Sequence, residues 1–345
     1  MDDRSAAHQP MNTLDPAPAL WDAGFAWFLF LFFLLNVGMG VFPPLLPQIM
    51  GGLDFSFAMA GLLGAAFGLA RFLTDLPVGL LVERLGFAPI MHAGLALFVA
   101  GTVLSAVAPS FEAMLAARAL LGFGSGAGNI VAILYLMQTG AASQRNRRAN
   151  LYELSVIAGM AVSADLGGMV GGRWGWRWSF WVAAAVFAGA WVVAAGPVSR
   201  ALGAVQATLA GPPEVPTGVE RGKPAASVML AIYFAMFTQA FAWGGGIATL
   251  LPLYGGSGLA LSSEGIGRIM ALAFWVEVCL LFPVGWATDA WGKLRIMLPG
   301  FFAIGIGVAA APMAGGVVGY GAAFSLLTSG MSVWMTAPAL LREQL

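Results

Sequence analysis

The segment Pro77-Val78-Gly79-Leu80-Leu81-Val82-Glu83-Arg84-Leu85-Gly86 has a second copy later in this chain. The copy is Pro283-Val284-Gly285-Trp286-Ala287-Thr288-Asp289-Ala290-Trp291-Gly292, a shift of 206 residues. In both copies Pro-Val-Gly is followed by an acid and then by a glycine at the same spacing, at the end of a long apolar run. The repeat predicts two similar helical bundles in tandem that enter the membrane from the same side.

The composition indicates that lipid surrounds much of this chain. Hydrophobic residues make up 59% of the 345 residues and charged residues only 9%, far from the usage of soluble domains. The net charge is zero, so nothing favours nucleic acid as a partner. Cys279 is the single cysteine and His8 and His92 are the two histidines, which predicts no disulfide, no metal site and no cofactor.

Charged residues and turn residues divide the apolar sequence into ten spans. Each span is long enough to cross roughly 30 Å of hydrocarbon, and Pro312 with Gly315 and Gly316 separates the last two. The expected fold is therefore an all-α polytopic membrane protein. The spans are 23–43, 57–80, 88–108, 112–138, 150–171, 178–198, 227–251, 264–287, 295–312 and 316–341.

The distribution of Lys and Arg predicts the orientation. With a cytoplasmic N-terminus, the outside loops hold Arg173 and Arg177, with Arg268 just inside the eighth span. By the positive-inside rule we expect a multi-pass protein of the plasma (inner) membrane with its N-terminus in the cytoplasm. The cytoplasmic segments then hold Arg4, Arg84, Arg145, Arg147, Arg148, Arg200, Arg221, Lys223, Lys293, Arg295 and Arg342.

The spans predict a domain organisation of two unequal bundles. Residues 1–22 are expected to form a cytoplasmic tail and residues 23–198 a six-helix bundle. The segment 199–226, which contains Gly211-Pro212-Pro213, is expected to be a non-helical cytoplasmic linker. Residues 227–345 are expected to form a second bundle of four helices.

Three motifs resemble those of the major facilitator superfamily. The first is Gly79 to Gly86 with its echo from Gly285 to Lys293, and the second is Arg118-Ala119-Leu120-Leu121-Gly122-Phe123-Gly124-Ser125-Gly126. The third, Ser163 to Gly172, resembles the helix-five motif of antiporters, with Ser163 and Gly168 in place of its first Gly and its Pro. The resemblance implies a fold of two six-helix bundles, and ten of these twelve helices are expected in this chain. It also implies membership of a drug/proton antiporter-like or general organic-solute branch of the family.

The resemblance also implies roles for the motif residues. It favours a conformational latch at the two repeated turns, although ordinary solvation at a helix end is the alternative. In the family the first latch docks partly on helix eleven, which has no counterpart here. The latch residues are Gly79, Glu83, Arg84, Gly86, Gly285, Asp289, Gly292 and Lys293. The glycines expected to pack helices closely are Gly122, Gly124, Gly126, Gly167, Gly168, Gly171 and Gly172.

Four charged residues inside the spans are the main candidates for function: Arg71, Arg118, Asp165 and Glu277. A charge at the bilayer centre costs at least about 2.5–3.5 kcal/mol, so such residues usually face partners or water. Arg71 and Glu277 each precede the repeated proline by six residues, so both are expected at one depth, facing the central cavity. Arg71 could instead pair with Asp75 on its own helix.

The other three residues, Arg118, Asp165 and Glu277, also have alternative roles. Arg118 could form a structural ion pair or hold an anionic group of a substrate. Asp165 and Glu277 lie on helices five and eight, which adjoin in this family, and either could take up a proton, with Glu277 favoured; a satisfied structural acid is the alternative. Because helices one and seven line the path in this family, the further cavity candidates are Asn36, Tyr233, Gln239 and Trp243.

These features predict a secondary transporter that moves a small organic solute by alternating access, coupled to protons. Efflux of amphipathic compounds is favoured over carboxylate uptake through Arg71 or Arg118. The sequence has no phosphate-binding loop and no catalytic constellation, so neither enzyme activity nor ATP use is expected. The alternatives are a non-transporting membrane scaffold or assembly factor with this fold, or an inactive truncated product.

Overall fold

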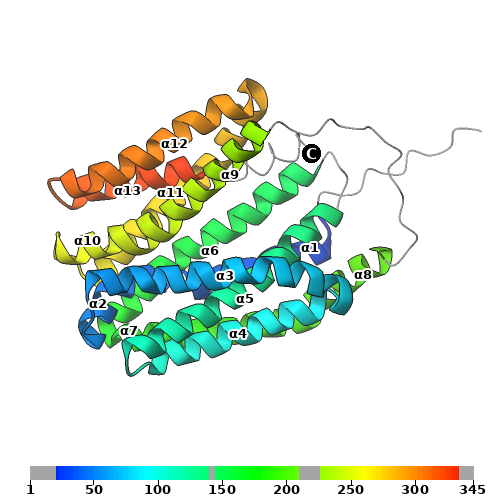
Figure 1. Ribbon diagram of the computed structural model, residues 1–345, viewed down its shortest axis with the longest axis horizontal. Coiled ribbons are helices and arrows are strands. Elements are labelled where there is room, and N and C mark those ends of the chain that lie inside the picture. The colour runs from blue at the N-terminus through cyan, green and yellow to red at the C-terminus, as the bar shows by residue number, and fades with distance from the viewer. Residues whose placement is uncertain (1–20, 140–143, 210–225, 334–345) are drawn as a thin grey trace, which may run out of the picture.

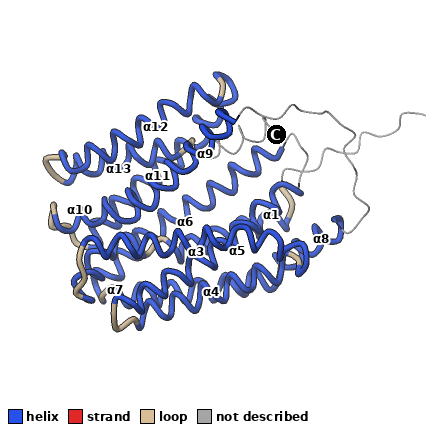
Figure 2. Tube along the Cα trace, viewed as in Figure 1, coloured by secondary structure: helices blue, strands red, loops and turns tan. Residues whose placement is uncertain are grey.

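The computed structural model describes residues 21–139, 144–209 and 226–333. Helices joined by short loops make up this described part, which contains no strand (Figure 2). Nine of its helical segments are long and apolar enough to cross a membrane, and a tenth apolar helix, Val317–Met331, is shorter. The expected all-α polytopic membrane fold is confirmed, while the predicted end of the last span lies outside the described residues.

The helices fall into two groups in Figure 1, with α9 to α13 above α1 to α8. The first group is α1 (Ala23–Met39), α2 (Phe42–Leu53), α3 (Phe57–Leu85), α4 (Phe87–Val107), α5 (Phe111–Gln138), α6 (Arg145–Trp174), α7 (Trp176–Val193), η2 (Ala194–Val198) and α8 (Ser199–Leu209). The second is α9 (Ala226–Phe241), η3 (Ala242–Leu250), α10 (Leu251–Ser257), α11 (Ser263–Trp291), α12 (Lys293–Ala310), η4 (Ala311–Met313) and α13 (Val317–Met331).

The two copies of the repeat form matching helices. Helices α3 and α11 both contain 29 residues, and their ends are related by the same shift of 206 residues as the motif. Ser56 caps the N-terminus of α3 by accepting a hydrogen bond from Met59 N, and Ser262 caps α11 by accepting one from Gly265 N. Equivalent caps at equivalent positions show that the duplication extends to the backbone.

The turns that flank these helices repeat as well. Gly86 and Gly292, which end the two helices, have φ angles of 87° and 93°, a region that favours glycine because it lacks a Cβ. Asp54 and Ala260, which precede the two helices, have φ angles of 49° and 50°. The glycine of the repeated motif is thus required by the sharp turn into α4 and α12.

Two predicted boundaries are wrong. The first span does not end at residue 43, because Pro43 and Pro44 occupy the first turn of α2, where a missing N–H costs nothing, and the helix resumes to Leu53. The linker 199–226 is not wholly non-helical, because α8 (Ser199–Leu209) continues from the π-helical segment that contains Pro197. A π-helical turn can absorb the lost proline hydrogen bond.

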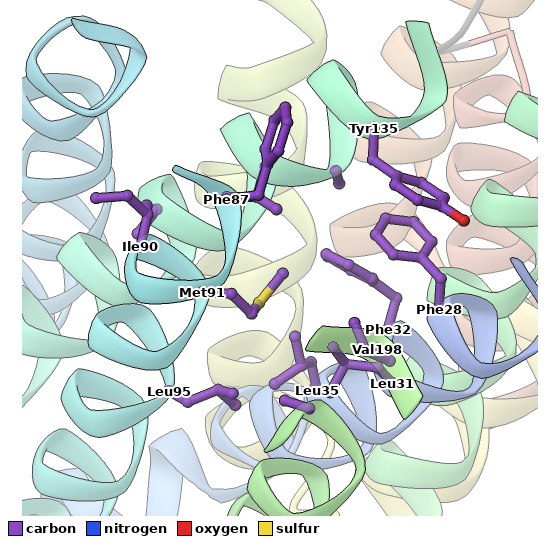
Figure 3. Close-up of a cluster of buried hydrophobic side chains, with 14 of the residues drawn as sticks. Phe28, Leu31, Phe32, Leu35, Phe87, Ile90, Met91, Leu95, Tyr135 and Val198 are labelled. Carbon is purple, nitrogen blue, oxygen red and sulfur yellow. The ribbon is translucent and has the colours of Figure 1, made fainter. Parts of the chain in front are cut away.

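Aromatic and aliphatic side chains fill the core of the first group of helices. Figure 3 shows Phe28 and Phe32 of α1, Met91 of α4 and Tyr135 of α5 converging in this core. The Phe28 and Tyr135 rings are stacked with centroids 4.2 Å apart. A second core is different, because it joins Ile157, Ala161 and Ala164 of α6 to side chains of η3, α11 and α13. Helix α6 therefore connects the two groups.

Asp22 fastens the start of α1 to the start of α6. One carboxylate oxygen accepts a hydrogen bond from Phe25 N at 2.8 Å, and the other pairs with Arg148 Nη2 at 3.0 Å. The Arg148 guanidinium lies 4.0 Å from the Phe25 ring centroid, and its side chain is only 2% exposed. A single carboxylate thus caps one helix and neutralises a buried cation of another.

Asp22→Ala is expected to lower the melting temperature of the purified protein in detergent. It removes an N-cap contribution of about 0.5–2 kcal/mol and leaves the buried Arg148 with no anionic partner at this position. Asp22→Asn retains a good capping side chain and removes only the ion pair, so we expect an intermediate melting temperature. Equal melting temperatures for wild type and Asp22→Ala would contradict this role.

Candidate functional site

The site is built on the close contact between α6 and α11. A Cβ added to Gly168 would lie 2.5 Å from Ser263 O and 3.0 Å from Gly267 Cα. A Cβ added to Gly267 would in turn lie against the carbonyl oxygen of Ala164. These small residues let the two backbones touch, as in other membrane helix pairs, and they fix which residues face each other across the interface.

Glu277 lies at the middle of this helix pair and is the fifteenth of the 29 residues of α11. The residue is 5% exposed, and no hydrogen bond or ion pair joins it to the described part of the chain. It lies within electrostatic range of Glu153 of α6. A buried and a half-buried carboxylate, one from each group of helices, are therefore within electrostatic range of each other.

Glu153 was missed in the sequence-based selection of charged residues. It lies inside the predicted span 150–171, three residues from its start. The structure leaves it half-buried, within electrostatic range of Arg71 as well as Glu277. Counting every charge inside a predicted span, including those in its first turn, would have found it.

Arg71 occupies the position in α3 that Glu277 occupies in α11, since each is the fifteenth residue of its helix. Its guanidinium acts on Glu153 and also on Asp75, one turn along α3. One buried oxygen of Asp75 has no hydrogen-bond partner among the described residues, and no ion pair within 4.0 Å joins Asp75 to Arg71. Arg71 is thus a cation within electrostatic range of Glu153 and Asp75 rather than half of a closed ion pair with Asp75.

Asp165 lies apart from Glu277. Its side chain is exposed and lines a groove of about 530 Å³ between α6 and α11, together with Arg268 and Trp275. The predicted candidates on helices five and eight are therefore on adjacent helices, but the structure does not bring their carboxylates together.

Arg118 is enclosed by aromatic rings. Its side chain is 7% exposed, and its guanidinium carbon lies 4.0 Å from the Phe42 ring centroid and 4.7 Å from that of Phe67. Its Nε has no hydrogen-bond partner among the described residues. Cation–π contacts with α2 and α3 thus take the place of the expected ion pair.

The four predicted cavity residues have different surroundings. Asn36 donates a hydrogen bond to Phe32 O of its own helix at 2.8 Å and is buried. Gln239 is 1% exposed, and neither polar atom of its amide has a partner among the described residues. The Trp243 ring lies 6.0 Å from the Phe274 ring of α11, whereas Tyr233 is exposed. Gln239 is therefore the candidate whose polar atoms remain free for a ligand.

The repeated turns have their own contacts. Glu83 and Arg84 are exposed, and the turn at Gly86 packs against Gln206 of α8, whose Oε1 accepts a hydrogen bond from Phe87 N at 3.3 Å. This contact joins the first turn to the segment that leads into the linker. The side chain of Asp289 lies outside the described residues, and Gly292 and Lys293 form the turn into α12.

Seven of the remaining motif glycines lie at four helix contacts. Gly122 and Gly126 lie against α3, and Gly124 lies against α4. Gly167 and Gly171 lie against Val41 and Leu45 of the α1–α2 segment, while Gly168 and Gly172 lie against α11. Gly79 and Gly285 lie within α3 and α11, and the latter approaches Asn150 of α6.

Comparison with known proteins decides the family. The Major Facilitator Superfamily profile matches residues 28–342, nearly the whole chain. The chain belongs to the Major Facilitator Superfamily. The resemblance noted from the sequence motifs is thereby confirmed, and with it a family of transporters rather than enzymes.

Similar curated proteins have several kinds of names. "Inner membrane transport protein YajR" of Escherichia coli is 30% identical over 44% of this chain and 34% of its own length. "Fatty acid resistance protein FarB" of Neisseria gonorrhoeae is 27% identical over 48% and 33%. The E. coli arabinose-proton symporter is 36% identical over 33% and 23%. The matches thus span about a third or less of these relatives' length.

Solved structures share the fold over most of their length. A D-xylose-proton symporter superposes with a TM-score of 0.66 at 13% identity, covering 92% of this chain and 82% of its own. A peptide transporter in complex with alafosfalin gives the same TM-score at 15% identity, covering 90% and 79%. At these identities the likeness concerns the fold alone.

Proposed function

We propose that this Major Facilitator Superfamily protein is a secondary transporter that moves a small organic solute by alternating access and couples the movement to protons. The observation that carries the proposal is the pair Glu153 and Glu277, one from each group of helices, within electrostatic range inside the bundle. Two ionised carboxylates repel in a medium of low dielectric constant. A proton or a cationic solute bound between them would remove that repulsion.

The helix pair that carries these carboxylates also suits the required motion. Gly168 and Gly267 bring the α6 and α11 backbones together without interlocking side chains. In alternating access one bundle rocks against the other around a fixed site. Loading of the glutamate pair would then favour one relative position of residues 23–198 and 227–345, and unloading would favour the other. We propose these two ranges as the moving bodies, joined by the linker 199–226.

The solute class follows from the charges in the interior. Gln239 offers unpaired amide atoms, and the two glutamates outnumber Arg71 in this part of the site. Arg118, the other cation considered for carboxylate binding, is enclosed by Phe42 and Phe67. We therefore propose an amphipathic organic amine as the solute in preference to a carboxylate, in a protein of the inner membrane with a cytoplasmic N-terminus.

Proteoliposomes with an imposed proton gradient test this function. We expect the gradient to drive movement of at least one lipophilic amine from a panel that also contains neutral compounds and monocarboxylates. A protonophore should abolish the movement, and protein-free liposomes should show only passive diffusion. Flux that ignores the proton gradient for every compound would contradict proton coupling, and gradient-driven flux of monocarboxylates alone would contradict the proposed solute class.

A further inference from the structure

The groove between α6 and α11 faces outward rather than toward the interior. Leu272 and Trp275 of α11, which line it, are both exposed, whereas the α6 residues Ser163 and Gly167 contact α1 and α2 on another side of that helix. In a membrane protein an exposed apolar helix surface contacts lipid. The groove of about 530 Å³ is therefore open to the bilayer.

The groove carries one charge of each sign at the same depth. Arg268 lies nine residues from Glu277, the middle residue of α11, which is about 14 Å along a helix. Ala164 contacts Gly267, so Asp165 lies at the depth of Arg268. Half of a 30 Å hydrocarbon layer is about 15 Å. Both charges are thus at the edge of the hydrocarbon, where phospholipid headgroups begin.

Asp165 and Arg268 do not form an ion pair with each other. Arg268 Nη2 pairs with Glu264 Oε1 at 2.6 Å, and the Arg268 side chain is 63% exposed. A guanidinium has five N–H donors, so others remain for a second acceptor. Asp165 has no hydrogen bond or ion pair to the described residues. The groove therefore offers a free acceptor and a partly free cationic donor on opposite walls.

We propose that this groove binds the headgroup of a phospholipid that carries a primary ammonium, such as phosphatidylethanolamine. The ammonium donates hydrogen bonds to Asp165, while the phosphate accepts from Arg268. The acyl chains continue toward the membrane centre over the apolar surface formed by Ala161, Val162 and Leu272. A quaternary choline headgroup has no N–H and cannot make the bond to Asp165. This site is independent of the proposed solute pathway.

Native mass spectrometry of protein loaded with equimolar phosphatidylethanolamine and phosphatidylcholine tests the proposal. We expect the wild type to retain phosphatidylethanolamine about tenfold more than phosphatidylcholine, a factor that corresponds to about 1.4 kcal/mol. Asp165→Asn should reduce the preference, because the hydrogen bond that only the primary ammonium can donate is then no longer strengthened by the carboxylate charge. Arg268→Gln should reduce retention of both, because both carry the phosphate.

Glu112→Gln is the matched control, since Glu112 is an exposed acid at the start of α5, away from the groove. It should leave the preference unchanged. Equal retention of the two lipids by the wild type would overturn the proposal, as would an unchanged preference in Asp165→Asn. A further measurement adds a lipophilic amine to the lipid-loaded protein. If the amine displaces the lipid with the same potency from the wild type and from Arg268→Gln, the groove is an amine site and the proposal is overturned.

Discussion

Gly267→Val is expected to separate α6 from α11 and to leave little folded protein. A Cβ at this position would lie against the Ala164 carbonyl oxygen and 3.1 Å from Gly168 Cα. Both contacts are with the backbone, so no side chain can turn aside to make room. Overpacking of this kind costs about 3 kcal/mol or more. The measurement is the yield and the melting temperature of the monodisperse protein in detergent.

The repeat provides a matched control for this substitution. Gly61 is the equivalent of Gly267 in α3, and a Cβ added there would meet nothing within 4 Å. Gly61→Val makes the same chemical change in a helix of the same length, and valine is a somewhat better helix former than glycine. We expect wild-type yield and melting temperature from Gly61→Val. Equal damage from the two variants would show that the α6–α11 contact is not responsible.

Glu277→Gln is expected to lower proton-driven accumulation of the transported solute by about tenfold or more, a change of about 1.4 kcal/mol in the driving equilibrium. The amide has almost the shape of the carboxylate but can neither bind a proton in this range nor repel Glu153. The repulsion between the two side chains would then no longer depend on proton binding, so proton binding could not favour one position of the bundles over the other. Downhill exchange of the solute, which needs no proton, should be affected far less.

The measurement compares uphill and downhill flux in the same proteoliposomes. Glu112→Gln removes a charge from the exposed start of α5 and should retain wild-type coupling. Glu153→Gln should reproduce the effect of Glu277→Gln, and the double variant should be no worse than either single variant if the two act as one site. Unchanged uphill accumulation in Glu277→Gln would remove this residue from the proposed mechanism.

Local sequence predicted the helices well where one strong signal dominated. The predicted spans 57–80 and 264–287 begin within one residue of α3 and α11, and the repeated glycines mark the turns at Gly86 and Gly292. Prolines were harder to interpret. The first span was predicted to end at residue 43, yet a helix tolerates proline in its first turn, and α2 continues through Pro43 and Pro44 to Leu53.

The candidate site was predicted only in part. Glu277 was selected because a charge in an apolar span is costly and needs a reason. Glu153 was overlooked because a residue three positions from the end of a span can face either solvent or the protein interior. The sequence alone does not distinguish the two. Asp165 and Arg268 were treated separately, because nothing in the sequence indicates that they line one groove.

By itself the sequence determined that this chain is a helical membrane protein with an internal duplication, and its motifs pointed to the family. These properties follow from local patterns, namely apolar length, turn residues and the recurrence of Pro77 to Gly86. Only the tertiary structure decided that Glu153 lies within electrostatic range of Glu277 while Asp165 lines a separate groove. The rotation of each helix about its axis depends on which small residues let backbones touch, here Gly168 and Gly267. That contact joins residues about 100 positions apart, so no local pattern can specify it.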